Sequence, residues 1–227
     1  MRIRRLTLAT GDLEGQAAFW GGRLGLPVRG DGEDAIEVRL RDSAVRFERA
    51  EAGLGARYHF AFNVPSSSIH AAVAWLRERH EVLTFDGDPV RTDVGAGCVY
   101  FLDAAGNVVE LIASPSIADG DGPFGPDSLI EVAEIGIASS DVDATSAAVQ
   151  AAFDQPVFWH DMESRLTAVG DRHAVVIVAP IGRGWIPVDL TARPLPTAIV
   201  AVGQGPREIT LPEGPYRLRV EPASRDR

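Results

Sequence analysis

The sequence contains a single cysteine, Cys98, among its 227 residues. One cysteine excludes an internal disulfide framework and a cysteine-rich zinc site, and such scarcity is typical of a reducing compartment. No apolar run approaches the roughly 20 residues that a membrane helix needs, and residues 1–15 lack the apolar stretch of a secretory signal. We therefore expect a cytoplasmic protein without a membrane partner.

The sequence also has little positive charge. Its formal net charge is −10, so the average surface repels phosphate backbones, and we expect no nucleic-acid partner. No phosphate-binding glycine loop and no nucleophile elbow is present, which argues against kinase, dehydrogenase and hydrolase functions. What remains is a composition with 45% hydrophobic and 24% charged residues, which is typical of a globular protein with its own core.

Three segments repeat one layout, in which a short alternating strand and a turn residue precede an amphipathic helix. In each segment an N-cap residue, Asp12, Ser66 or Asp141, stands where the helix should begin. Apolar residues then recur at helical spacing. The three segments are 5–20, 59–76 and 134–153.

Further strands are predicted after each helix, so the repeating unit is βαβββ. A fourth copy has three strands but no helix between the first two. The predicted strands are 35–40, 44–49, 82–85, 98–102, 108–113, 157–160, 165–169, 174–179, 198–202, 207–211 and 216–220.

A stretch rich in Gly, Pro, Ser and Asp lies between the second and third copies and is typical of a linker. We therefore predict an α+β protein of two domains, each made of two paired modules. The first domain is 1–115, the linker 116–128, and the second, degenerate domain 129–227.

Several runs carry a resemblance to a known superfamily. LTLATGDLEGQAAFWGGRLGLPV resembles the opening of a vicinal-oxygen-chelate domain, and YHFAFNV followed by VYFLDAAGNVVELIA resembles its second module. This superfamily includes glyoxalases, bleomycin-resistance proteins and extradiol dioxygenases. The resemblance covers residues 1 to about 115 and implies paired βαβββ modules around a cavity, with metal ligands on the first and last strands of each module.

Carried over residue by residue, the resemblance places His59 on the first strand of module two and Glu110 on its last strand. Both residue types suit Fe(II), Mn(II), Ni(II) or Zn(II). In module one, Arg5 stands where a histidine or glutamine is expected, and a guanidinium does not bind metal. The second ligand position of module one, on its last strand, falls at Arg46. Glu48 lies on the same face of that strand and becomes a third ligand only if the alignment of the strand shifts by two residues.

The second domain lacks a matching ligand set. Its corresponding positions are Glu134, Val176, Thr197 and Leu218, which we interpret as a lapsed cavity in a domain with a structural, covering or dimer-forming role.

Two functions stay open at this point. In the first, one divalent metal at His59 and Glu110 makes the protein a lyase or a ring-cleaving dioxygenase, with Glu110 or Glu48 moving a proton. In the second, the site holds no metal, because Arg5 pairs with the otherwise costly buried carboxylate of Glu110. The protein then sequesters a small molecule, as bleomycin-resistance proteins do in a cavity shared by a homodimer. Arg5, Arg46 and Tyr100 are the predicted substrate-binding residues.

Overall fold

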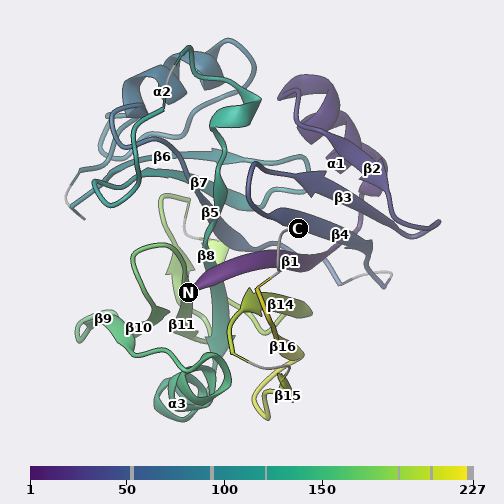
Figure 1. Ribbon diagram of the computed structural model, residues 1–227, viewed down its shortest axis with the longest axis vertical. Helices are drawn as coiled ribbons and strands as arrows, with labels where there is room; N and C mark the ends of the chain where they lie inside the picture. Colours follow the sequence, from purple (N-terminus) through teal and green to yellow (C-terminus); the bar gives the residue numbers. More distant parts are fainter. Residues whose placement is uncertain (52–53, 93–94, 121, 189, 205–206, 224–227) are drawn as a thin grey trace.

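A computed structural model describes residues 1–51, 54–92, 95–120, 122–188, 190–204 and 207–223 (Figure 1). These residues form a 14-stranded mixed sheet, a separate two-stranded hairpin and a few helices that pack on the sheet. The predicted α+β class is confirmed.

The helices are short and follow the first strands of the first three modules. They are α1 (Leu13–Ala17), which continues as a π-helix (Ala18–Arg23), α2 (Ile69–Arg77) and α3 (Val142–Phe153), with a 3-10 turn at Pro126–Ser128. The first two modules contribute strands β1 (Arg2–Thr10), β2 (Val28–Gly30), β3 (Ala35–Arg39), β4 (Ala44–Arg49), β5 (His59–Asn63), β6 (Gly97–Leu102) and β7 (Val108–Ala113). The last two contribute β8 (Glu131–Ser139), β9 (Val157–Asp161), β10 (Leu166–Gly170), β11 (Val175–Pro180), β14 (Thr197–Val202), β15 (Arg207–Thr210) and β16 (Tyr216–Glu221), and β12 (Gly184–Trp185) pairs with β13 (Leu190–Thr191).

The modules do not pair as the sequence suggested. Module one pairs with module four through β1 and β14, and module two pairs with module three through β5 and β8. Two strand sets result: a cavity sheet, in the order β6-β7-β5-β8-β11-β10-β9, and a second sheet, in the order β2-β3-β4-β1-β14-β16-β15. They join where Ile3 pairs with Val132. Each sheet therefore takes strands from both sides of the predicted linker, which Figure 1 shows in the mixed colours of each sheet.

The turn chemistry explains where two of the helices begin. The Asp12 carboxylate accepts a hydrogen bond from Gly15 N (2.8 Å), and the Asp141 carboxylate accepts one from Ala144 N (2.9 Å), as predicted for N-caps. The prediction for Ser66 is wrong: Ser68 precedes α2, and the Ser66 hydroxyl bonds to Asp119 instead. The strand predicted at 82–85 is reduced to isolated bridges.

Strand alternation separates the two faces of the cavity sheet. Phe60 and Phe62 of β5 pack in the main core, where Trp20 lies 6.4 Å and 5.8 Å from their ring centroids. His59 and Ala61 point to the opposite, concave face. The predicted orientation of this strand is therefore confirmed, and polar side chains of alternate residues reach the concave face.

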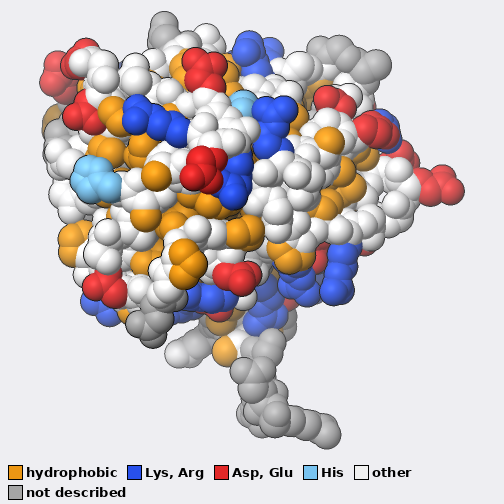
Figure 2. Space-filling model, turned by 90° about the horizontal axis from the view of Figure 1, so that it is seen from above, with side chains coloured by type: hydrophobic (Ala, Val, Ile, Leu, Met, Phe, Trp, Pro, Cys, Tyr) orange, Lys and Arg blue, Asp and Glu red, His pale blue; other side chains and the backbone are white. Residues whose placement is uncertain are grey.

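In the part of the chain that the structure describes, no helix is long and apolar enough to cross a membrane. Figure 2 shows that basic and acidic side chains are interspersed on the face seen from above, with hydrophobic side chains between them.

Candidate metal site

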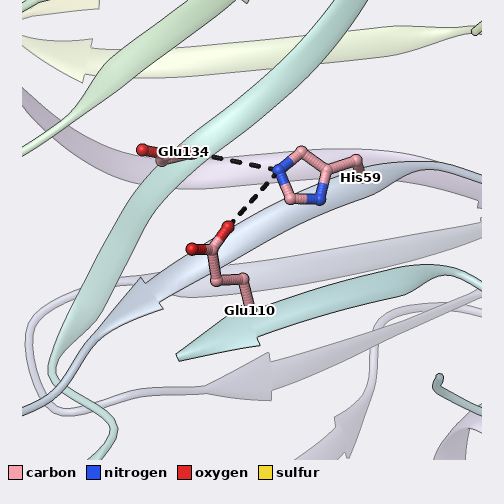
Figure 3. A group of neighbouring side chains, drawn as sticks. All are labelled: His59, Glu110 and Glu134. Atoms are coloured by element: carbon pink, nitrogen blue, oxygen red, sulfur yellow. Dashed lines mark ion pairs between the residues drawn. The ribbon is translucent and has the colours of Figure 1, made fainter. Parts of the chain in front are cut away.

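Three side chains from three strands converge on the concave face of the cavity sheet (Figure 3). His59 Nε2 lies 3.6 Å from Glu110 Oε2 and 3.8 Å from Glu134 Oε2. One ligand atom from each residue lies within 4.8 Å of the others. Nitrogen and oxygen ligands stand about 2.0–2.2 Å from a metal ion, so atoms that share one ion lie about 3 to 4 Å apart. The observed distances fit a shared ion.

Strand pairing explains why these residues meet. His59 of β5 is paired with Val108 of β7, and Glu110 stands two residues further along, on the same face. On the other side of β5, the antiparallel strand β8 brings Glu134 opposite Ala61, next to a register shift. The site therefore forms at the contact between modules two and three.

The charges in this site are unbalanced without a cation. The side chains of His59 and Glu110 are each 7% exposed, and that of Glu134 is 19% exposed. Burial, followed by repulsion from Glu134, raises the pKa of Glu110 to about 7, and burial raises the pKa of Glu134 to about 7. Burial also lowers the pKa of His59, which favours the neutral imidazole that binds metals.

Neither carboxylate forms an ion pair with an arginine of the described chain. Two buried carboxylates beside a neutral imidazole leave an excess of negative charge, which a divalent cation would compensate. The donor set, one imidazole nitrogen and two carboxylate oxygens, suits Mn(II), Ni(II), Fe(II) or Zn(II). The residues present therefore fit the implied metal.

Neighbouring groups hold two of the three side chains in place. The Tyr100 hydroxyl donates to Glu110 Oε1 (2.8 Å), which leaves Oε2 facing His59. The His59 ring stacks on the Trp185 ring at a centroid distance of 5.2 Å and an interplanar angle of 27°. Nδ1 of His59 is buried without a hydrogen-bond partner among the described residues. Ring stacking therefore orients this imidazole.

The three side chains line a cavity of about 710 Å³. Its walls come from both halves of the chain: Cys98 and Tyr100 lie on one side, and Ile177 and Trp185 lie on the other. Phe158 and Trp159 of the edge strand β9 also line it and are 51% and 37% exposed. A volume of this size accommodates a small organic molecule.

Gly136 makes room for the tryptophan that stacks on His59. A Cβ at this position would lie 2.5 Å from Trp185 Cη2. We expect Gly136→Ala to displace the indole and lower the free energy of unfolding by about 1–3 kcal/mol, measured by chemical denaturation. Gly11→Ala is the matched control, because a Cβ there meets nothing within 4 Å. Equal stability of the two variants would contradict this close packing.

Of the residues predicted from the sequence, the structure brings together His59, Glu110 and Tyr100 in this cavity. It places Arg5, Arg46 and Glu48 on β1 and β4 of the second sheet.

The expected convergence of Arg5 with His59 and Glu110 is wrong, because β1 pairs with β4 and β14 while β5 pairs with β7 and β8. Arg46 instead forms ion pairs with Asp31 and Glu48. The register slip that would make Glu48 a ligand does not occur, since Arg5 pairs with Ala44 and Arg46 stands two residues on, as Glu110 does relative to Val108.

Glu134 is the residue of this site that the sequence analysis assigned to a lapsed cavity in the second domain. The repeat identifies it as the first-strand ligand position of module three, but combines it with Val176, Thr197 and Leu218. Val176 belongs to the main core on the opposite face of β11, and Ile177 lines the cavity instead. Thr197 and Leu218 are buried in strands of the second sheet. The sequence does carry one signal for this ligand: glutamate, a metal-binding residue type, stands at the first-strand ligand position of module three. Pairing of module three with module two is enough to complete the site.

No protein-family model matches the chain, and no curated protein sequence matches it either. Solved structures do resemble it. A "putative dioxygenase" from Bacillus subtilis superposes with a TM-score of 0.65 at 15% identity, over 97% of this chain and 84% of that chain. Glyoxalase I from Zea mays superposes with a TM-score of 0.57 at 13% identity, over 96% of this chain and 91% of that chain.

These similarities, two complete βαβββ modules and two reduced ones show that the chain has the vicinal-oxygen-chelate fold. At such low identity, they establish the fold alone.

Proposed function

We propose that this protein is a metal-dependent enzyme that moves a proton on a small substrate bound through two neighbouring oxygens. The observation that carries the proposal is the group of His59, Glu110 and Glu134, two buried and one partly buried, in a cavity of about 710 Å³. A divalent ion held by these residues would act as a Lewis acid that stabilises negative charge on substrate oxygens.

The two carboxylates are suited to different tasks. Glu110 is fixed by the hydrogen bond from Tyr100, whereas Glu134 is more exposed and has no hydrogen bond within the described chain. Burial raises the pKa of each to about 7 in the metal-free site, and a bound cation would lower both values, so a carboxylate that leaves the ion could accept and return a proton near neutral pH. Glu134 is therefore the better placed of the two to carry the proton, and Glu110 would remain a fixed metal ligand. This revises the sequence-based assignment of proton transfer to Glu110 or Glu48.

A lyase or isomerase reaction fits this donor set better than ring-cleaving oxygenation does. Non-haem Fe(II) oxygenases with a facial triad use two histidines and one carboxylate, whereas this site offers one histidine and two carboxylates. The fold-level similarity to glyoxalase I agrees with a proton-transfer reaction. Dioxygenase activity is the second candidate, favoured by the similarity to the Bacillus subtilis protein.

The non-catalytic alternative, a metal-free binding protein, depended on an arginine that neutralises Glu110. Arg5 lies on the second sheet and does not do so. Metal-free sequestration therefore leaves the two buried carboxylates without a counter-charge, and we favour the metal-dependent enzyme.

The proposal is tested by elemental analysis of protein equilibrated with Fe(II), Mn(II), Ni(II) or Zn(II). We expect near-stoichiometric binding of at least one metal in the wild type and none in His59→Ala. Metal-loaded protein is then assayed for isomerisation of thiol conjugates of 2-oxoaldehydes and for cleavage of catechols. Absence of metal from the wild type under all four conditions would reject the proposal.

Tyr100→Phe should weaken metal binding without abolishing it, because the Glu110 carboxylate loses the hydroxyl that orients it. Loss of such an orienting partner typically costs about 10–100-fold in metal affinity. Competition with a fluorescent chelator measures the change. The matched control is Tyr58→Phe, whose hydroxyl bonds to Ala9 N and Pro196 O. Equal affinities of Tyr100→Phe and the wild type would show that this hydrogen bond does not support the site.

A further inference from the structure

Arg183 occupies an unusual position at the wall of the cavity. It precedes the short hairpin strand β12 and lines the cavity together with Trp185. Its Nη1 donates to Gly184 O (2.9 Å), and its Cζ lies 5.6 Å from the centroid of the Trp185 ring. The Trp185 ring therefore contacts both the Arg183 guanidinium and the His59 imidazole, whose ring centroid lies 5.2 Å from that of the indole.

This guanidinium forms no ion pair with any residue that the structure describes. The nearest acidic influence is Asp161, which attracts Arg183 from beyond ion-pair distance while its carboxylate accepts a hydrogen bond from the Ser164 hydroxyl. Burial lowers the pKa of Arg183 despite that attraction. Arg183 lines the cavity and donates to one carbonyl oxygen among the described residues, so its guanidinium, which carries five N–H groups, has donors left for a bound molecule.

The other charged groups at the cavity wall either have partners of their own or are exposed to solvent. Asp171 pairs with the Met1 amino group, and His173 Nδ1 lies 3.2 Å from Glu131 Oε1. Arg91 lies over the Phe85 ring at 5.1 Å. Arg172 is exposed to solvent at the rim. Arg183 is therefore the cation best placed to receive a charged group of a bound molecule.

We propose that Arg183 binds a carboxylate of the substrate while the substrate's two neighbouring oxygens lie at His59, Glu110 and Glu134. This inference rests on the proposed function, because it places the reacting end at the candidate metal site. A planar guanidinium binds a carboxylate through two parallel hydrogen bonds, and a monoanion is repelled less by nearby Asp161 than a phosphate dianion is. Phe158 and Trp159 offer an apolar wall for the segment between the two polar ends.

The substrate class is therefore an oxygen-chelating molecule with an apolar or aromatic spacer and a terminal carboxylate. Protocatechuate, homoprotocatechuate and dihydrocaffeate are suitable probes, since all three carry two adjacent oxygens and differ only in the length of the carboxylate tether. The methyl ester of each probe keeps the shape and removes the charge.

Calorimetric titration of Zn(II)-loaded protein measures the preference for acid over ester. We expect at least one acid to bind about 10-fold more tightly than its ester, equivalent to about 1.4 kcal/mol. Arg183→Gln should remove that preference with unchanged zinc content, and Arg183→Lys should retain part of it. The matched control is Arg193→Gln, because Arg193 is exposed and bonds to the carbonyl oxygens of Leu54 and Gly55 outside the cavity.

Equal binding of every acid and its ester, failure of all acids to bind, or a preference that survives in Arg183→Gln would overturn the assignment. The same titrations on metal-free protein separate the two proposals. If zinc does not bind, the proposed function fails, but an acid preference that depends on Arg183 still supports the carboxylate site. If zinc binds and no acid is preferred, only the assignment of Arg183 fails.

Discussion

Glu134→Gln should reduce the affinity for the preferred divalent metal by on the order of 100-fold or more, to the same extent as Glu110→Gln. Loss of a group that merely orients a ligand already costs about 10–100-fold, so loss of a ligand should cost at least as much. Both replacements keep the size of the side chain, and in Glu110→Gln the new amide oxygen can still accept the hydrogen bond from Tyr100. Competition titrations with a chelator measure the affinities.

Glu48→Gln is the matched control for this prediction. Glu48 is the carboxylate that the sequence offered as a third ligand, and the structure places it in an ion pair with Arg46 on the second sheet. Its replacement should leave the metal affinity unchanged. An effect of Glu48→Gln equal to that of Glu134→Gln would mean that modules one and two form the site, as the sequence first suggested.

Glu110→Gln should also stabilise the metal-free protein at pH 8. Burial raises the pKa of Glu110 from 4.5 to about 7, so the folded state binds protons more tightly than the unfolded state does. The contribution of this group to stability is therefore lost as the pH rises from about 4.5 to about 7. Because one pKa unit corresponds to about 1.4 kcal/mol, Glu110→Gln should raise the free energy of unfolding by roughly 3 kcal/mol at pH 8.

Chemical denaturation of the chelator-treated wild type and the variant at pH 5 and pH 8 measures this effect. The difference between them should be below about 1 kcal/mol at pH 5, because this pH lies only half a unit above the unfolded pKa of 4.5, and should reach its full size at pH 8. Excess metal should reverse the order at pH 8, since it binds only the folded wild type tightly. A variant that is less stable than the metal-free wild type at pH 8 would contradict the charge imbalance of the site.

Local sequence patterns predicted most of the fold. Alternation placed Phe60 and Phe62 in the core and His59 on the concave face, and Asp12 and Asp141 marked two helix starts. Both kinds of signal depend on residues close in the chain, where side-chain period and capping chemistry act directly. The N-cap prediction at Ser66 is wrong because α2 begins after Ser68, two residues further on. The Ser66 hydroxyl donates a hydrogen bond to Asp119 instead.

The composition of the site was harder to predict, because it depends on which modules pair. Nothing local in β5 distinguishes β1 from β8 as the neighbouring strand, since both belong to copies of one repeat. Pairing of β5 with β8 brings Glu134 to His59 and takes Arg5 away. The sequence-based prediction therefore left out Glu134 and included Arg5 for the same reason, which is that it paired module two with module one.

The most direct test of the central claim is anomalous diffraction from crystals soaked in Ni(II) or Zn(II). We expect one strong peak that lies about 2.0–2.3 Å from His59 Nε2 and from an oxygen of both Glu110 and Glu134. The peak should be much weaker in crystals of Glu134→Gln soaked at the same metal concentration. A peak beside Glu48 and Arg46 on the second sheet, or none near His59 at saturating metal, would contradict a metal site shared by modules two and three.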